Sequence, residues 1–350
     1  MEYIALKNIC KINMGQSPDS TSYNKEKYGI PFFQGNADFG ERFPITRVWC
    51  SSPIKIAKNE DILISVRAPI GAVNFAKEEC CIGRGLASLT LDTSKVSIEY
   101  IYWLLKAKNE ELNLKGTGST FKAISKKVLE DILVPDIELK KQNQCAEILD
   151  KTYNIIQKYR EELTDLDTLI KARFVELFCN KGYPIIKWND IFNTTTGKLD
   201  SNDAVEDGKY PFFTCAKEAS RIDDFAFDQE ALLLAGNNAA GKYYVKYYKG
   251  KFNAYQRTYV LSLKNDWSYQ LFRYQLEDKL VYLQQQSLGG LTKYLTMKIL
   301  ETLEFVVPPK IRQIEFENFV AQVDKSKSAV KKALDETQLL FDSLMQEYFG

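Results

Sequence analysis

A long heptad pattern in the middle of this sequence constrains the fold more than any other feature. From about Lys141 to Phe178, apolar or tolerant residues are spaced alternately by three and four positions. This spacing predicts one long helix that packs along another helix. The positions expected in its packing seam are Leu149, Thr152, Ile156, Tyr159, Leu163, Leu166, Ile170 and Leu177.

The same pattern returns near the end of the chain, from about Ile311 to Phe349. Adding 171 to each seam position gives Val320, Val323, Lys327, Val330, Leu334, Thr337, Phe341 and Tyr348. Only Lys327 departs from the apolar trend. The chain is therefore predicted to be an internal duplication, in which each half is a globular region followed by a long helix.

Connectivity limits how the two halves are arranged. A helix of about 38 residues is roughly 57 Å long, whereas the linker from Cys179 to Ile186 spans at most about 28 Å. The second globular region must therefore stay near the far end of the first helix. If the second helix is to bury its seam against the first, it has to run back toward the first globular region. The sequence predicts an α+β fold: two pseudo-twofold-related mixed α/β domains separated by an antiparallel two-helix coiled coil. The predicted ranges are 1–140 and 181–310 for the domains, and 141–180 and 311–350 for the helices.

The two globular regions repeat one order of elements. In the first, we expect short strands with a buried run at Asp61–Val66, a helix over Ile98–Leu114 and a short helix near Ser125–Ile132. In the second, Pro211-Phe212-Phe213 corresponds to Pro31-Phe32-Phe33, and the run Ala231–Leu234 corresponds to the buried run. Gly241 corresponds to Gly71, and a helix expected over Ser268–Gln286 corresponds to the first helix.

Composition excludes several classes of protein. The net charge is only +1, so any nucleic-acid contact must come from local patches rather than from bulk attraction. The chain has no histidine, and its seven cysteines include no C-x-x-C pair. A Cys/His zinc site and a disulfide scaffold are therefore disfavoured, and reduced cytoplasmic thiols are expected. No stretch approaches 18 apolar residues, so we expect no membrane segment.

Catalytic signatures are mostly missing from the sequence. Neither a G-x-G-x-x-G nor a P-loop motif is present. Asp136 and Glu138, followed by Lys140, superficially match a nuclease carboxylate cluster that would hold a metal ion. The equivalent stretch from Pro308 to Gln313 has no acidic residue. A charged lead-in to the first long helix is the preferred interpretation, and neither a catalytic residue nor a metal site is predicted.

A basic and aromatic stretch in the second half is a candidate DNA contact. Strand alternation would place Lys242, Tyr244, Lys246 and Tyr248 on one face, and Lys249-Gly250 would form a turn. The returning strand would then present Lys251, Asn253, Tyr255 and Arg257 on a single face. Such a ribbon suits phosphate contacts and base-edge hydrogen bonds. A solvated hairpin is the equally weighted alternative.

The first half offers arginines and a small-residue loop. Arg67 follows the buried strand run, and Arg84 lies between two glycines. Either would form two hydrogen bonds to guanine or pair with a nearby carboxylate. The loop Lys115–Lys122 and its counterpart Ser287–Lys293 are candidates for clamping a phosphate. The candidate residues in these loops are Lys115, Thr117, Ser119, Lys122 and Lys293.

These residues resemble the DNA-specificity (S) subunit of Type I restriction-modification enzymes. The resemblance covers nearly the whole chain. It depends on the segments 64–71, 81–87, 118–122, 210–214 and 250–259. One departure is the segment Asp136 to Gln142, which leads into the first long helix. It lacks the second proline and the acidic residue followed by glutamine that are common there in the family.

The resemblance implies a non-catalytic subunit that recognises a bipartite sequence in double-stranded DNA. Each target-recognition domain would read one half-site, and the helices would set the unread spacer. Two methyltransferase (M) subunits would bring S-adenosylmethionine and base-flipping chemistry, and restriction (R) subunits would bring ATP- and Mg-dependent translocation and cleavage. No cofactor is expected in this chain, and the two half-sites are expected to differ.

Three alternatives remain open. The chain could serve a Type IIB or phage-defence methylation system as its specificity subunit. It could be a metal-dependent nuclease that uses Asp136 and Glu138, or a coiled-coil scaffold whose heads bind protein.

Overall fold

The computed structural model describes residues 2–118, 122–239 and 241–350, and the chain forms two compact units. Unit 1 comprises Met1–Arg160 with Ala333–Gly350, and unit 2 comprises Glu161–Lys332. Each unit holds one mixed α/β head together with a segment of both long helices. These units divide the helices between them, so the predicted domain boundaries stay predictions. Among the described residues, no helix is both long enough and apolar enough to cross a membrane.

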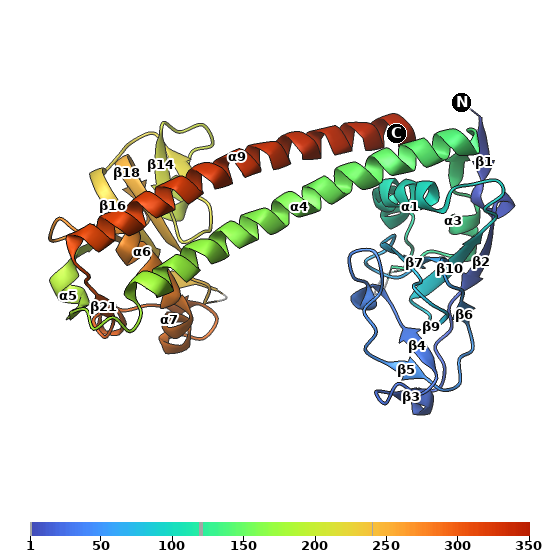
Figure 1. The fold of residues 1–350 in the computed structure, drawn as a ribbon, viewed down its shortest axis with the longest axis horizontal. Coiled ribbons are helices and arrows are strands. Elements are labelled where there is room, and N and C mark those ends of the chain that lie inside the picture. The colour runs from blue at the N-terminus through green and yellow to red at the C-terminus, as the bar shows by residue number, and fades with distance from the viewer. Residues whose placement is uncertain (1, 119–121, 240) are drawn as a thin grey trace. The chain divides into compact units, whose positions relative to one another are not determined.

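The two long helices are α4 (Leu139–Phe178) and α9 (Lys310–Phe349), as predicted to within two residues. In unit 1, the rings of Tyr153 and Phe341 lie 6.1 Å apart, and Arg160 donates a hydrogen bond to Gln338 at 3.4 Å. Between these two contacts, the residue number in α4 rises from 153 to 160 while that in α9 falls from 341 to 338. The helices therefore pack antiparallel in unit 1 (Figure 1).

Unit 2 shows the same direction of packing. Lys327 pairs with Asp167 at 2.6 Å, and the rings of Phe178 and Phe316 lie 5.3 Å apart. The predicted antiparallel pairing is thus confirmed within each unit. Lys327, the one charged seam position, is half-buried and is accommodated by this ion pair.

All of the predicted seam positions are buried or half-buried. Leu149, Ile156 and Phe341 join the core of unit 1, while Ile170, Val320 and Val323 join the core of unit 2. The half-buried positions are Tyr159, Leu163, Leu166, Lys327, Val330, Leu334, Thr337 and Tyr348. The seam is therefore buried most deeply where a head packs against the helix pair.

The described residues of unit 1 form three sheets. The first sheet pairs β1 (Tyr3–Ala5) with β11 (Leu133–Pro135). The second contains, in spatial order, β2 (Cys10–Met14), β10 (Leu86–Leu91), β7 (Ile62–Ser65) and β8 (Val73–Phe75). The third contains, in spatial order, β3 (Tyr23–Asn24), β5 (Trp49–Cys50), β4 (Ile30–Phe33), β9 (Cys80–Ile82) and β6 (Ile56–Ala57). Short 3-10 turns lie at Leu6–Asn8, Ser20–Ser22 and Asn36–Asp38. The predicted buried run is β7, whose four residues are all fully enclosed.

Unit 2 pairs its strands in a similar order, but two of them, of 9 and 10 residues, are longer than any described strand of unit 1. One sheet pairs β12 (Ile185–Lys187) with β21 (Glu304–Val306), and another pairs β17 (Asn237–Asn238) with β20 (Lys293–Tyr294). The largest sheet contains, in spatial order, β13 (Phe192–Thr196), β19 (Thr258–Leu263), β16 (Phe227–Ala235), β18 (Val245–Ala254), β14 (Tyr210–Phe213) and β15 (Ser220–Ile222). A 3-10 turn lies at Ser201–Asp203. In both heads the Pro-Phe-Phe strand pairs parallel with its neighbour, β4 with β9 and β14 with β18, as the repeat predicts.

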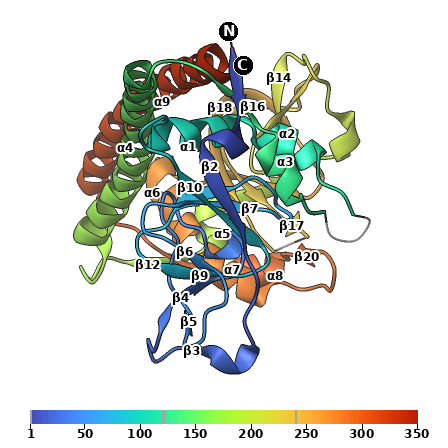
Figure 2. The same ribbon diagram turned by 90° about the vertical axis from the view of Figure 1, so that its right-hand side faces the viewer.

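The helix after the central strands joins each sheet to the long helices. In unit 1 it is α1 (Ile98–Ala107), where Tyr102 stacks on Phe75 of β8 at 4.5 Å and Trp103 packs against Phe341 of α9 at 5.4 Å. Figure 2 shows α1 between the sheet and α4. In unit 2 its counterpart is α6 (Tyr269–Asp278), where Tyr274 packs against Phe316 of α9 at 5.5 Å.

Two predicted helices are each broken once. Ile98–Leu114 divides at Lys108 into α1 and α2 (Asn109–Leu114), and Ser268–Gln286 divides at Lys279 into α6 and α7 (Leu280–Gln286). The remaining short helices are α3 (Lys126–Glu130), α5 (Trp188–Ile191) and α8 (Met297–Leu300). The breaks occur at equivalent places in the repeat, since α1 and α6 begin 171 residues apart, as do α2 and α7.

Candidate nucleic-acid interface

In unit 1, two adjacent strand ends bring the predicted arginines to one edge of the sheet. Ser65, the last residue of β7, pairs with Leu86, the first residue of β10. Beyond this pair, the Val66 N–H donates to the Gly85 carbonyl at 2.9 Å. Arg67 and Arg84 therefore follow and precede neighbouring strands, and both are exposed.

The small-residue loop lies against the same edge. The Ala68 N–H donates to the Lys122 carbonyl at 3.1 Å, and Arg67 forms a β-bridge with Ala123. Lys122 is exposed. We refer to this edge, formed by Arg67, Arg84 and Lys122, as the strand-end site of unit 1.

Mutual backbone hydrogen bonds close the loop. The Thr117 N–H donates to the Ala123 carbonyl at 3.0 Å, and the Ala123 N–H donates to the Thr117 carbonyl at 2.9 Å. Thr117 is exposed, whereas the predicted contact Ser119 lies outside the described residues. Lys115 is exposed but pairs with Glu111 at 2.5 Å. Its charge is therefore already partly neutralised.

Close backbone packing fixes the position of Arg84. A Cβ atom at Gly85 would lie 2.4 Å from the Gln34 carbonyl oxygen, and one at Gly83 would lie 3.0 Å from the Gln34 Cα. Gly85 is therefore required for this approach, and a side chain at Gly83 would crowd the Gln34 backbone. The backbone on both sides of Arg84 is consequently packed against Gln34, while the Arg84 side chain is exposed.

Unit 2 builds the same edge from different side chains. The mutual hydrogen bonds of Leu288 and Tyr294, at 3.0 and 2.9 Å, close the second loop, and Lys293 pairs with Asn238 across β17 and β20. The Gly236 N–H donates to the Arg257 carbonyl at 2.8 Å, as Val66 does to Gly85. The strand-end site of unit 2 therefore contains Asn237, Gln256 and Lys293.

Asn237 and Gln256 were not predicted as contacts. Gln256 is exposed and Asn237 is half-buried. Aligning the two sequences on the strand runs and counting toward the strand ends would have found both. The predicted contact Lys242 is exposed and follows Gly241, where a Cβ atom would lie 3.3 Å from Lys293 Cγ. Lys242 therefore lies beside this site.

The predicted ribbon with a turn at Lys249-Gly250 is wrong. Val245–Ala254 is one continuous strand, and Lys249 and Gly250 pair with Glu230 and Gln229 of β16. Lys249 also forms an ion pair with Glu230 at 3.1 Å. The long partner strand and this ion pair favour extended backbone at a sequence that would otherwise suit a turn.

The continuous strand separates the residues that the ribbon was meant to gather. By strand alternation, Lys246 lies on the face opposite to Lys251 and Asn253. Asn253 is only 4% exposed, and its Oδ1 accepts from the Ala254 N–H at 2.9 Å. Asn253 therefore cannot reach a base edge in this fold. Tyr255 is half-buried, and Arg257 is exposed next to Gln256.

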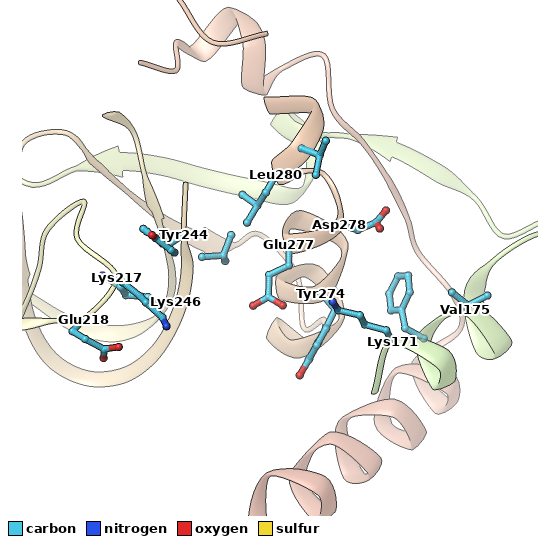
Figure 3. A pocket seen from close by; sticks show the side chains of 13 residues that line it. Lys171, Val175, Lys217, Glu218, Tyr244, Lys246, Tyr274, Glu277, Asp278 and Leu280 are labelled. Carbon is cyan, nitrogen blue, oxygen red and sulfur yellow. The ribbon is translucent and has the colours of Figure 1, made fainter. Parts of the chain in front are cut away.

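Lys246 and Tyr244 line a cavity of about 640 Å³ in unit 2, which Figure 3 shows between α4, α6 and β18. Lys246 Nζ donates to the Ala216 carbonyl at 2.6 Å, and burial lowers its pKa. Glu277 on the cavity wall pairs with Arg273 at 2.9 Å. Lys246 therefore contacts the backbone of its own head, whereas Lys122 of the strand-end site in unit 1 is exposed.

Asp136 and Glu138, the residues of the nuclease alternative, are exposed in the lead-in to α4. Within residues 2–118, 122–239 and 241–350, no three or more His, Cys, Asp or Glu side chains gather as potential metal ligands. The structure therefore adds no third ligand to this pair in the part of the chain that it describes.

The fold and the site define a duplicated protein with two basic or polar strand-end sites and an antiparallel pair of long helices. The family model of the Type I restriction modification DNA specificity domain matches residues 1–165 and 180–337. The chain belongs to this family.

Known proteins support the same assignment. The protein named MjaX type I restriction enzyme specificity subunit, from Methanocaldococcus jannaschii, is 43% identical over 157 residues, which are 45% of this chain and 37% of that protein. The Type I restriction enzyme EcoDI specificity subunit of Escherichia coli is 34% identical over 154 residues, 42% of this chain and 33% of that protein. These matches span about a third of each relative's length.

One solved structure matches the whole chain. The Type I restriction-modification system S subunit from M. genitalium aligns with a TM-score of 0.70 at 16% identity, covering 100% of this chain and 96% of that protein. At this identity the likeness concerns the fold alone.

Proposed function

We propose that this chain is the non-catalytic specificity subunit of a Type I restriction-modification enzyme and that it recognises a bipartite sequence in double-stranded DNA. The duplicated strand-end site carries this proposal. Both heads hold polar side chains at the same strand ends, of which Arg67, Arg84 and Gln256 are exposed, and a lysine on the same loop. Lysines suit phosphate contacts, while arginine and amide groups suit base edges.

In this proposal the long helices set the distance between the half-sites. Each helix contains 40 residues, which is about 60 Å of helix. The seam side chains of the two helices face each other, and the strand-end sites lie in the heads rather than on the helices. The base pairs between the half-sites would therefore not be read.

The chemistry would come from partner subunits. Two methyltransferase subunits would supply S-adenosylmethionine-dependent methyl transfer, and restriction subunits would supply ATP- and Mg-dependent cleavage. A cytoplasmic location follows from the DNA substrate. The names of the relatives, which are specificity subunits of restriction enzymes, support this division of labour.

The test is methyl transfer with purified components. The chain, its methyltransferase partner and S-adenosylmethionine are incubated with a DNA library, and the methylated sequences are read. We expect methylation of one two-part sequence only when both proteins are present. Methyl transfer by the isolated chain, or the same methylated sequence with the partner alone, would contradict the proposal.

A further inference from the structure

The two strand-end sites share the same pattern of backbone hydrogen bonds but carry different side chains at two strand ends. Arg67 bridges Ala123 in unit 1, and Asn237 pairs with Tyr294 in unit 2. Both partners close the small-residue loop through the same mutual hydrogen bonds. Asn237 therefore occupies in unit 2 the place of Arg67 in unit 1.

A second position shows the same replacement. The Gly83 N–H donates to the Phe33 carbonyl at 2.8 Å, and the Tyr255 N–H donates to the Phe213 carbonyl at 3.0 Å. Two residues later, the Gly85 and Arg257 carbonyls accept from Val66 and Gly236. The residues between these anchors are Arg84 and Gln256, so Gln256 stands where Arg84 stands.

Arg67, Arg84 and Gln256 are exposed to a ligand, and Asn237 is half-buried. Arg67 and Arg84 are exposed and form no hydrogen bond or ion pair through their side chains with any described residue. Gln256 is exposed, and its Nε2 lies 3.4 Å from Asp200 Oδ2, which is close to the limit of a hydrogen bond. Short, anchored backbone holds each side chain at the end of a strand, as a base-reading group requires.

The replacement has a chemical meaning at base edges. Arginine matches the O6 and N7 acceptors of guanine with two parallel hydrogen bonds, whereas asparagine and glutamine match the N6 donor and N7 acceptor of adenine. We propose that the head of unit 1 reads guanine through Arg67 and Arg84, and that the head of unit 2 reads adenine through Asn237 and Gln256. This inference rests on the proposed function and assigns the base class at each head.

The experiment compares methylated sequences from complexes of the methyltransferase partner with full-length variants. Arg84→Gln is expected to reduce the preference for guanine at one position of one half-site by roughly 10- to 100-fold, with adenine gaining, and to leave the other half-site unchanged. Gln256→Arg is expected to reduce the preference for adenine in the other half-site. Arg67→Asn provides a second variant at an independent strand end.

Two controls separate base reading from charge. Arg84→Lys keeps the charge but loses the two-pronged donor, so it is expected to lose discrimination while retaining most of the affinity for DNA. Lys140→Gln removes an exposed charge on α4, outside the strand-end sites, and is expected to leave both half-sites unchanged.

The outcomes distinguish the inference from the proposed function. If the wild-type complex reads a two-part sequence but Arg84→Gln leaves both halves unchanged, or weakens binding equally on all sequences, the base assignment is overturned and the function stands. If the wild-type complex shows no two-part preference, the proposed function itself fails.

Discussion

Gln142 and Gln313 make the same two hydrogen bonds in the two units. Gln142 Oε1 accepts from the Ser97 N–H at 2.9 Å, and its Nε2 donates to the Ile137 carbonyl at 2.8 Å. Gln313 makes the same pair with Ser268 and Pro308, at 2.9 and 2.8 Å. Each amide thus joins the start of α1 or α6 to the start of a long helix. The lead-in from Asp136 to Gln142 departs from the sequence common in the family, yet Gln142 still makes both hydrogen bonds.

We expect Gln142→Ala and Gln313→Ala each to lower the free energy of unfolding by about 2–4 kcal/mol, because each leaves a buried donor and acceptor without partners. The two side chains are only 2% and 1% exposed. Urea titrations followed by circular dichroism would measure the loss.

Gln144→Ala and Gln322→Ala are the matched controls, since both side chains are exposed on the same helices. They should change stability by less than about 0.5 kcal/mol. Equal effects at buried and exposed positions would mean that the two junctions do not depend on these amides.

The aromatic surroundings of the Lys106 ammonium group should make the free energy of unfolding depend on pH. Its Nζ lies 4.9 Å from the ring centroids of Tyr102 and Tyr153 and 5.0 Å from that of Trp103. Burial, and then the nearby Arg42 charge, lower its pKa from 10.5 to about 8. Below pH 8 both the folded and unfolded states hold the proton, so the full cost of burying the cation is present.

Between about pH 8 and 10.5 the unfolded chain binds more protons at this lysine than the folded chain, so its contribution to stability rises with pH. We therefore expect the stability of Lys106→Met relative to wild type to fall by about 2 kcal/mol across this range, after cation–π contacts offset part of the burial cost. Urea titrations from pH 7 to 10.5 measure it, with Lys140→Met as control. A constant difference between variant and wild type would refute the prediction.

The loop lysines should act on phosphates rather than on bases. We expect Lys122→Ala and Lys293→Ala each to weaken binding of the complex on matched and mismatched DNA alike, and to reduce the slope of log affinity against log salt by about 0.9. Fluorescence anisotropy at several salt concentrations measures this. An unchanged salt slope would argue against phosphate contact.

Changing the helix length tests the spacer. Deleting residues 159–165 from α4 and 330–336 from α9 keeps the seven-residue pattern and shortens each helix by about 10 Å. At about 3.4 Å per base pair, we expect the tolerated spacer to shorten by about three base pairs with unchanged half-sites. Altered half-sites with the original spacer would count against the helices as the measure of distance.

Much of the architecture could be predicted because it depends on patterns that recur at a fixed offset. The heptad spacing predicted α4 and α9. The short linker, together with packing of one seam on the other, predicted that the helices run antiparallel. The loops closed by Thr117 and Leu288 were matched correctly, as were Gly71 and Gly241, which both adopt positive φ. These features are encoded locally and appear twice.

Other features depend on partners distant in sequence. Lys249-Gly250 suits a turn by itself, but pairing with β16 keeps it extended. The helix breaks at Lys108 and Lys279 involve no glycine or proline, so no local signal reveals them. Asn237 and Gln256 became candidates only once backbone hydrogen bonds aligned the two strand-end sites.

The most direct test of the central claim is a genome-wide map of methylated bases in cells that carry the methyltransferase partner, with and without this chain. We predict two unlike half-sites at a fixed separation, methylated only when the chain is present. An uninterrupted methylated sequence, or an identical map without the chain, would contradict the account.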